Sequence, residues 1–276
     1  MKSTVKLITG IAGIFILSLI SSCQKEYSNN TNNVKGYDQD AWAFIQNSGI
    51  TDSTQQSAIN NLVVDLKTHS LWQKFYAIYP MVGGTPATMK WNLKNPIDAD
   101  AAYRLTFNGS PVFSSSGLLC PTTADFADTH FNDATFIYNN NSISFYSGTQ
   151  NTASGYDMGC TDSGISNEFT IYNAGDASNW FGYFDFMPMP SNTVGLFMLS
   201  ATATSVARYE NGMLVNSSGA PQPGATNHNI LIGSVMDAPS VGRRMCEFAS
   251  IGQGLSGTEA QIFSNIVQNF EVSLSR

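Results

Sequence analysis

Residues that could carry out chemistry are few and lie far apart in this sequence. The histidines are three: His69, His130 and His228. None stands at the spacing of a metal site or a catalytic triad, and we expect a polar surface role for each. Gly254-Leu-Ser256 begins a G-x-S-x-G nucleophile turn, but Thr258 replaces its last glycine. The sequence therefore offers no recognisable pair of nucleophile and base.

A glycine pattern, Gly252-Gln-Gly-Leu-Ser-Gly257, matches the G-x-G-x-x-G of dinucleotide sites. It follows a predicted strand and opens a predicted helix. A dinucleotide-binding fold also needs a parallel strand after that helix, and the sequence predicts none before Arg276. We therefore expect these glycines to turn a strand tightly into a capped helix, with no bound cofactor.

Hydrolysis of a glycosidic bond would need two carboxylates that flank it. Four acidic residues in or beside predicted strands are the candidates: Glu168, Asp185, Glu210 and Glu247. They are isolated from one another in sequence, so only the fold could pair them. We expect no catalytic residues, and a polysaccharide-degrading enzyme is the alternative.

Binding chemistry is better represented than catalysis. The segment from Asp176 to Phe186 combines Asn179 and carboxylates with aromatic rings, which together can hold a sugar. The rings are Trp180, Phe181, Tyr183 and Phe184. Alternation along a strand would bury one set of them in a sandwich core, and we favour that role.

A short acidic run, Asp157-Met-Gly-Cys-Thr-Asp162, could hold calcium through carboxylates and backbone carbonyls. Ordinary turn chemistry explains Asp and Gly at these positions equally well. Calcium is the one cofactor that the sequence leaves open.

The first 22 residues are predicted to be a signal peptide. Lys2 and Lys6 introduce an apolar, uncharged run from Leu7 to Ile20, and two serines follow it. A positive start, an apolar centre and small residues before a cleavage point are typical of secretory leaders. The run is shorter than the roughly 20 apolar residues that a membrane-spanning helix needs.

Ile20-Ser-Ser-Cys23 resembles the lipobox of bacterial lipoproteins. The resemblance implies that Cys23 carries fatty acyl chains such as palmitate, two or more of which hold a protein stably in a bilayer. Gln24-Lys-Glu26 resembles the tag that sends some Gram-negative lipoproteins to the outer face of the outer membrane. Residues 23–36, rich in Asn and Ser, are predicted to be a flexible tether. We expect a lipid-anchored protein of the outer membrane, displayed on the cell surface.

The composition suits an exported β domain. Aromatic residues make up 12% of the chain, and its 23 glycines favour turns between strands. The net charge is −7, and it becomes −9 when Lys2 and Lys6 leave with the leader. Nucleic-acid binding relies on clustered Lys and Arg, which are scattered here, so we expect no nucleic-acid partner.

Three cysteines lie beyond residue 23: Cys120, Cys160 and Cys246. Export would permit a disulfide, and an odd number allows at most one bridge within the chain. Cys120 and Cys160 lie in segments that read as loops, and Cys246 lies in an apolar run that reads as a strand. We expect a Cys120–Cys160 disulfide, with three free thiols as the alternative; none of the spacings suits zinc.

Residues 37–80 are predicted to be a helical segment packed on the domain that follows. A short helix covers 38–47, and Asp52-Ser-Thr-Gln55 has the form of a helix start. A further turn or two is expected over 71–78. The second helix has one apolar face at helical spacing: Ala58, Ile59, Leu62, Val63 and Leu66.

From residue 81 the period changes to that of strands. Short apolar runs punctuated by Gly, Asn, Asp, Pro and Ser are typical of a sandwich or barrel. They lie at 89–93, 103–107, 134–139, 142–147, 169–173, 180–186, 194–199, 205–209, 212–216, 229–233 and 246–252. Ser256-Gly-Thr-Glu259 is a capping box and predicts a final helix.

Two stretches, Ser205–Asn216 and Phe248–Glu259, together resemble the last third of laminin-G-like and concanavalin A-like lectin domains. The first is a strand, an Asn211-Gly212 turn and a strand, and the second is a strand leading to a Leu-Ser-x-x-Glu cap. The resemblance implies a mostly β, antiparallel jelly-roll β-sandwich over residues 81–276, with N-terminal helices and a C-terminal helix. Glucanases of this type carry a Glu-x-Asp-x-x-Glu signature that the sequence lacks.

These patterns favour a non-catalytic recognition domain, with a surface glycan as the leading ligand and a protein ligand, as in adhesion, next. The alternatives are a polysaccharide-degrading enzyme and an envelope protein without a small ligand.

Overall fold

The computed structural model describes most of the chain after the predicted tether. The described residues are 36–137, 139–151, 155–162, 168–173, 179–182, 185–188, 193–219, 226–235 and 243–276. Residues 35–276 form one compact unit. The predicted leader and Cys23 lie outside the described residues, and within them no helix is both long and apolar enough to cross a bilayer.

Two antiparallel sheets make up the core of this unit. Sheet A contains β1 (Phe75–Tyr79), β3 (Val112–Ser114), β4 (Gly117–Leu119), β6 (Asn141–Ser147), β11 (Gly195–Ala201), β12 (Val206–Glu210), β13 (Met213–Ser218) and β15 (Cys246–Gly252). Sheet B contains β2 (Thr106–Asn108), β5 (Phe126–Asn132), β7 (Gly155–Thr161), β8 (Glu168–Asn173) and β14 (Asn229–Ile232). A separate hairpin pairs β9 (Asn179–Gly182) with β10 (Asp185–Pro188).

The sandwich core lies between the two sheets. Strand β5 alternates between buried and half-buried residues, so that Ala127, Thr129 and Phe131 point inward. Facing side chains from sheet A include Phe145, Phe197 and Ile251. The predicted fold class is confirmed: the protein is a mostly β, antiparallel sandwich with helices at both ends.

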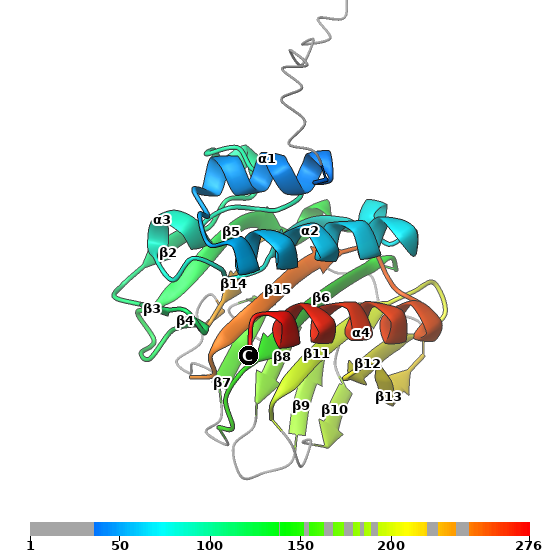
Figure 1. Cartoon of the computed structure of the whole chain (residues 1–276). Coiled ribbons are helices and arrows are strands. Elements are labelled where there is room, and N and C mark those ends of the chain that lie inside the picture. The colour runs from blue at the N-terminus through cyan, green and yellow to red at the C-terminus, as the bar shows by residue number, and fades with distance from the viewer. Residues whose placement is uncertain are drawn as a thin grey trace, which may run out of the picture. The chain divides into compact units, whose positions relative to one another are not determined.

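A layer of helices covers the other face of sheet A (Figure 1). The helices are α1 (Gln39–Ser48), α2 (Ser53–Thr68) and α4 (Gly257–Ser273). The apolar face predicted for α2 is buried residue for residue, and Phe263 and Phe270 of α4 pack against Phe248 of β15. Each such side chain contributes about 1.5–3 kcal/mol of hydrophobic stabilisation. The central strands of sheet A, β6, β11 and β15, are therefore buried on both faces, whereas the edge strand β13 is largely exposed.

The predicted helix starts and hairpin are confirmed by their geometry. The Asp52 side chain accepts a hydrogen bond from Gln55 N at 2.8 Å, and Ser256 and Glu259 form the expected capping box of α4. Asn211 and Gly212 turn between β12 and β13 with φ of 50° and 79°, as a type I′ turn requires.

Three predicted elements are wrong. Where the sequence predicts a strand over 134–139, the structure has a 3-10 helix, Asp133–Thr135, and an isolated bridge between Ile137 and Asn140. Residues 71–78 form a short 3-10 helix, Trp72–Lys74, and then β1, which pairs with β15. The helical segment therefore ends before residue 80, because the apolar run 75–79 is buried as a strand of the sandwich. Residues 89–93 are no strand, since Pro86 and a Thr85 capping box start the short helix α3 (Pro86–Met89) there.

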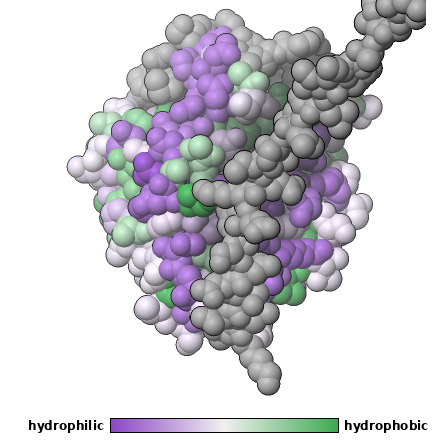
Figure 2. Space-filling view, turned by 90° about the horizontal axis from the view of Figure 1, so that it is seen from above, coloured by the Kyte–Doolittle hydropathy of each residue, from purple (hydrophilic) through white to green (hydrophobic). Residues whose placement is uncertain are grey.

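Seen from above, the described surface is mainly hydrophilic, and hydrophobic residues form only small separate patches (Figure 2). Among the large apolar residues that the structure describes, Met213 on the edge strand β13 is the most exposed, at 71%. Most apolar side chains of the described residues are thus buried in the two core layers.

Candidate functional site

The outer face of sheet B carries the candidate site. Helices α1, α2 and α4 pack on sheet A. The outward residues of β5 are half-buried, and three of them, Asp128, His130 and Asn132, are polar. Five polar side chains meet there, and we call them the His130 cluster: Asp100, Thr106, Asp128, His130 and Asn229. They come from the 3-10 helix Asp100–Ala102 and from strands β2, β5 and β14.

The backbone of β5 is distorted where it presents His130. Asn132 pairs with Asn229, but Asp128 pairs with Leu231, so β5 has more residues than β14 between the two pairs. His130 takes a φ of 56°, a left-handed conformation that non-glycine residues adopt at a cost. Its N–H donates to Asp128 Oδ1 at 2.7 Å, which holds the bulge in place. Such bulges re-aim a side chain.

The Nε2 side of the His130 imidazole is held by two neighbours, and Asp128 is held by Asn229. Its Nε2 lies 2.8 Å from Thr106 Oγ1 and 3.4 Å from Asp100 Oδ1. Asn229 Nδ2 donates to both oxygens of Asp128, at 3.1 and 3.2 Å. The side chain of Asp100 is 58% exposed and that of His130 is 20% exposed. The cluster is therefore fixed by internal bonds and still open to solvent.

Cations line one edge of the cluster. Arg104 Nη2 lies 2.8 Å from Asp100 Oδ1, and its Nε lies 3.5 Å from Asp98 Oδ1. Lys90 Nζ donates to Asp98 Oδ2 at 2.6 Å, and this hydrogen bond lowers the pKa of the Asp98 carboxyl. Both signs of charge thus lie within reach of a ligand at this face.

The cluster is suited to hydrogen bonding more than to catalysis. Thr106, His130 and Asp128 follow the order of nucleophile, base and orienting acid. However, His130 Nδ1 lies 4.0 Å from Asp128 Oδ2, beyond hydrogen-bond distance. The base would therefore lack the bond that fixes its tautomer. Oriented carboxylate, amide, imidazole and hydroxyl groups instead match the donors and acceptors of a polyhydroxylated ligand.

The carboxylates considered for hydrolysis are spread over the molecule. Glu168 lies on β8 of sheet B and accepts from Thr170 Oγ1 at 3.0 Å. Glu210, on β12 of sheet A, pairs with Arg208. Glu247 lies on β15 of sheet A, near Arg276. The fold therefore brings none of these three described residues together as a catalytic pair, and the side chain of Asp185 lies outside the described residues.

The predicted calcium run is not a loop. Gly155–Thr161 is strand β7, and Asp157 forms a buried ion pair with Arg244. Burial raises the pKa of Asp157, against the opposing charge of Arg244. Among the described residues, no group of three or more His, Cys, Asp or Glu side chains is placed to hold a metal ion.

The predicted Cys120–Cys160 disulfide is not formed in the structure, where Cys120, Cys160 and Cys246 are buried free thiols. Cys160 lies within β7, and Cys120 follows β4 on the other sheet with its thiol 3.8 Å from Ile232 O. Burial raises the pKa of Cys120 to about 12. The structure therefore agrees with the alternative, in which all three cysteines are free thiols.

The sequence predicts a polar surface role for His130 but does not predict the cluster around it. The signal was the spacing of Asp128 and His130, two residues apart in a segment that alternates in polarity, since this puts both on one face of a strand. Contacts with Thr106 and Asn229 could not be predicted from spacing. The aromatic side chains proposed for a sugar, from Trp180 to Phe184, lie outside what the structure describes, although the backbone of β9 and β10 pairs there.

Comparison with known proteins relates the chain to others through its fold alone. No protein-family model matches it, and no curated protein matches its sequence. Domain 4 of AbnA, a GH43 extracellular arabinanase from Geobacillus stearothermophilus, in complex with arabinotriose, is 16% identical, with a TM-score of 0.43 over 69% of this chain and 98% of that domain.

Two longer proteins are similar over a part of their length. Trypanosoma rangeli sialidase in complex with sialic acid is 11% identical, with a TM-score of 0.49 over 70% of this chain and 33% of the sialidase. The receptor binding domain of botulinum neurotoxin C/D mosaic serotype is 12% identical, with a TM-score of 0.40 over 70% of this chain and 51% of that domain. The chain thus spans about a third of the sialidase and about half of the receptor binding domain.

Proposed function

We propose that this protein is a non-catalytic recognition module that binds a glycan at the His130 cluster. The observation that carries the proposal is a rigid, solvent-accessible set of hydrogen-bonding groups on the one sheet face that the described helices leave uncovered. A sugar presents hydroxyls that both donate and accept, and the carboxylates, amide and imidazole of the cluster supply both kinds of partner. We also propose that this module is a laminin-G-like lectin domain.

The site of action that we propose is the cell surface. The predicted leader, the lipobox cysteine Cys23 and the polar tether up to Gly36 support export and anchoring by acyl chains in the outer membrane. Mass spectrometry of the protein from bacterial membranes should find Cys23 acylated and N-terminal, and Cys23→Ser should release the protein from membranes. An unmodified thiol at residue 23 would contradict the anchor.

A glycan array with the soluble body, residues 36–276, tests the binding. His130→Asn should weaken binding of any glycan hit at least tenfold, because the amide cannot reproduce both imidazole contacts, while Asn tolerates the positive φ. The matched control is His69→Asn, since His69 is exposed and bonds to Asp65 O on α2, away from the cluster. Absence of any hit, with or without calcium, would reject the glycan ligand.

The enzymatic alternative has its own readout. Incubation of the soluble body with mixed polysaccharides should release no reducing ends. Release that is lost on changing Glu168, Glu210 or Glu247 would replace the binding proposal by a hydrolase.

A further inference from the structure

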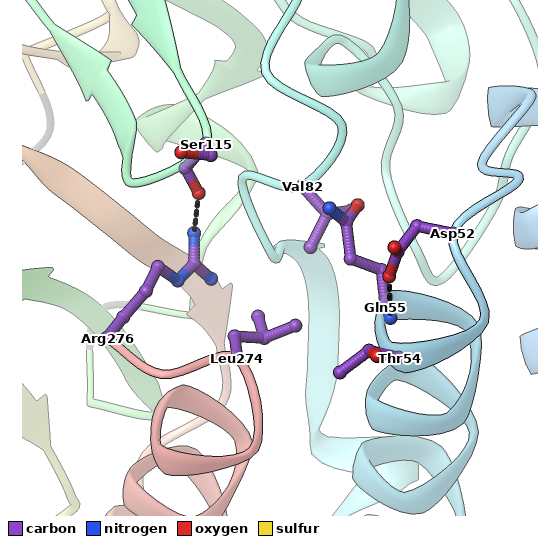
Figure 3. A pocket seen from close by; sticks show the side chains of 7 residues that line it. All are labelled: Asp52, Thr54, Gln55, Val82, Ser115, Leu274 and Arg276. Carbon is purple, nitrogen blue, oxygen red and sulfur yellow. Dashed lines mark hydrogen bonds between the residues drawn. The ribbon is translucent and has the colours of Figure 1, made fainter.

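A pocket lies between the start of α2, the residues that follow α4 and the turn between β3 and β4 (Figure 3). It has a volume of about 220 Å³, and its walls come from segments far apart in sequence. They are Asp52, Thr54 and Gln55 at the start of α2, Val82 after β1, Ser115 between β3 and β4, and Leu274 and Arg276 after α4. A cavity of about 150 Å³ already admits a benzene ring, so this one has room for a single six-membered ring with substituents.

One wall of the pocket holds an unused acceptor. Gln55 Oε1 is buried and has no hydrogen-bond partner, although buried polar atoms are normally paired. Beside it, the Asp52 carboxylate accepts from Gln55 N and stays exposed. A ligand that donates hydrogen bonds would find the Asp52 carboxylate exposed on this side, and it would reach Gln55 Oε1 once the Gln55 side chain turns toward the pocket.

The opposite wall is a fixed guanidinium. Arg276 Nη1 donates to Met81 O at 3.0 Å and to Ser115 O at 3.5 Å, and Nη2 donates to Pro80 O at 3.3 Å. Its Nε pairs with Glu271 at 2.8 Å. An arginine has five N–H donors, so these contacts hold the group rigid and leave one Nη2 hydrogen for a ligand.

We propose that this pocket binds one neutral sugar unit. Asp52 and Arg276 place opposite charges on facing walls, so an ion of either sign would meet a like charge. Hydroxyl groups, by contrast, can donate to Gln55 and accept from Arg276. Leu274 and Val82 add an apolar surface for the C–H face of a sugar ring. The inference goes beyond the proposed function and does not rest on the His130 cluster.

Titration of the isotope-labelled soluble body, residues 36–276, with methyl glycosides of glucose, galactose, mannose and N-acetylglucosamine, one at a time, tests the pocket by NMR. At least one glycoside should shift the side-chain amide signal of Gln55. Gln55→Met keeps the length of the side chain and removes the acceptor, so it should weaken that binding at least tenfold. Gln261→Met, at an exposed position of α4 outside the pocket, and His130→Asn should leave it unchanged.

Three outcomes would overturn the inference. They are no shift of the Gln55 signal with any of the four glycosides, binding that Gln55→Met leaves unchanged, and tighter binding of methylammonium or acetate than of every glycoside. Thermal melting of each variant separates a lost site from a lost fold. Failure here leaves the effect of His130→Asn on the glycan array intact, so the two proposals fail separately.

Discussion

At the scale of single residues, buried charges are the distinctive feature of this sandwich. Asp157 and Arg244 form an ion pair with both side chains fully buried. Arg244 also donates to Thr193 O at 3.2 Å, and its guanidinium lies 4.6 Å from the centre of the Phe197 ring. A buried pair of this kind adds little net stability while intact, but the loss of one partner leaves an uncompensated charge in the core.

Asp157→Asn should therefore lower the free energy of unfolding by about 3–5 kcal/mol, because the buried Arg244 would lose the charge of the carboxylate with which it pairs. Urea unfolding of the soluble body measures the change. Asp65→Asn, on α2, is the surface control and should change stability by less than about 0.5 kcal/mol. Equal effects of the two substitutions would show that Arg244 reaches water when Asp157 is lost.

Glu271 gives the fold a dependence on pH. Its side chain is fully buried beside Arg276, and burial raises its pKa from 4.5 to about 8 despite the charge of Arg276. Between about pH 4.5 and 8, Glu271 is therefore protonated in the folded state and ionised in the unfolded state. Stability from this group is complete below about pH 4.5 and falls as the pH rises through 8.

Across that window, the free energy of unfolding should fall by up to about 1.4 kcal/mol per pH unit. Glu271→Gln should flatten the slope, since an amide does not titrate. Urea unfolding of both proteins between pH 5 and 9 gives the comparison. Parallel pH profiles would contradict the raised pKa.

At the level of helices and strands, one glycine allows the β12–β13 hairpin to pack closely against helix α4. Gly212 has a φ of 79°, and a Cβ placed on it would lie 2.9 Å from Gln261 Cα and 2.9 Å from Ser264 Cβ. The tight turn thus permits the close approach of α4, whose capping box begins it at Ser256. The same glycine serves the local turn and the tertiary contact.

Gly212→Ala should destabilise the protein by at least about 1 kcal/mol, because an L-residue in the left-handed region costs about that much and the methyl group also meets α4. Gly219→Ala is the matched control, since Gly219 has open space around it and no unfavourable φ. Thermal melts of the two variants give the comparison. Equal melting temperatures would mean that α4 can shift away at no cost.

At the scale of the whole molecule, the layers are unequal. Helices and sheet B enclose sheet A, so that every residue of β6, β11 and β15 is buried. In sheet B, β5 has one face in the core and the other half-buried and mainly polar, whereas every residue of β7 is buried. The proposed binding site therefore lies on the less protected side of sheet B, at β2, β5 and β14.

Hydrogen exchange should follow this order. Backbone amides of β6 and β15 should exchange through global unfolding alone, because solvent reaches neither face, whereas amides of the edge strands β2 and β13 should exchange through smaller local openings. Mass spectrometry of peptides after exchange would measure both. Protection of β13 equal to that of β6 would indicate that something covers this edge.

How much could be predicted from sequence depends on how local each signal is. The cap at Asp52, the apolar face of α2, the Asn211-Gly212 hairpin and the capping box at Ser256 each extend over a few residues, and all are confirmed. Strand β1 was read as helix because apolar residues at 75–79 suit either element, and only pairing with β15 decides between them.

Local signals in the sequence are enough to predict a β-rich domain with capped helices before and after its strands, because side-chain caps and short-range periodicity act within one or two turns. The candidate site depends on contacts between segments that are far apart in the sequence. Asn229 meets Asp128 across 101 positions of sequence, and Arg244 meets Asp157 across 87. Such contacts depend on which strands are neighbours in the sheets. Burial of apolar residues over the whole sandwich determines that strand order, so the residue spacing within one segment cannot predict it.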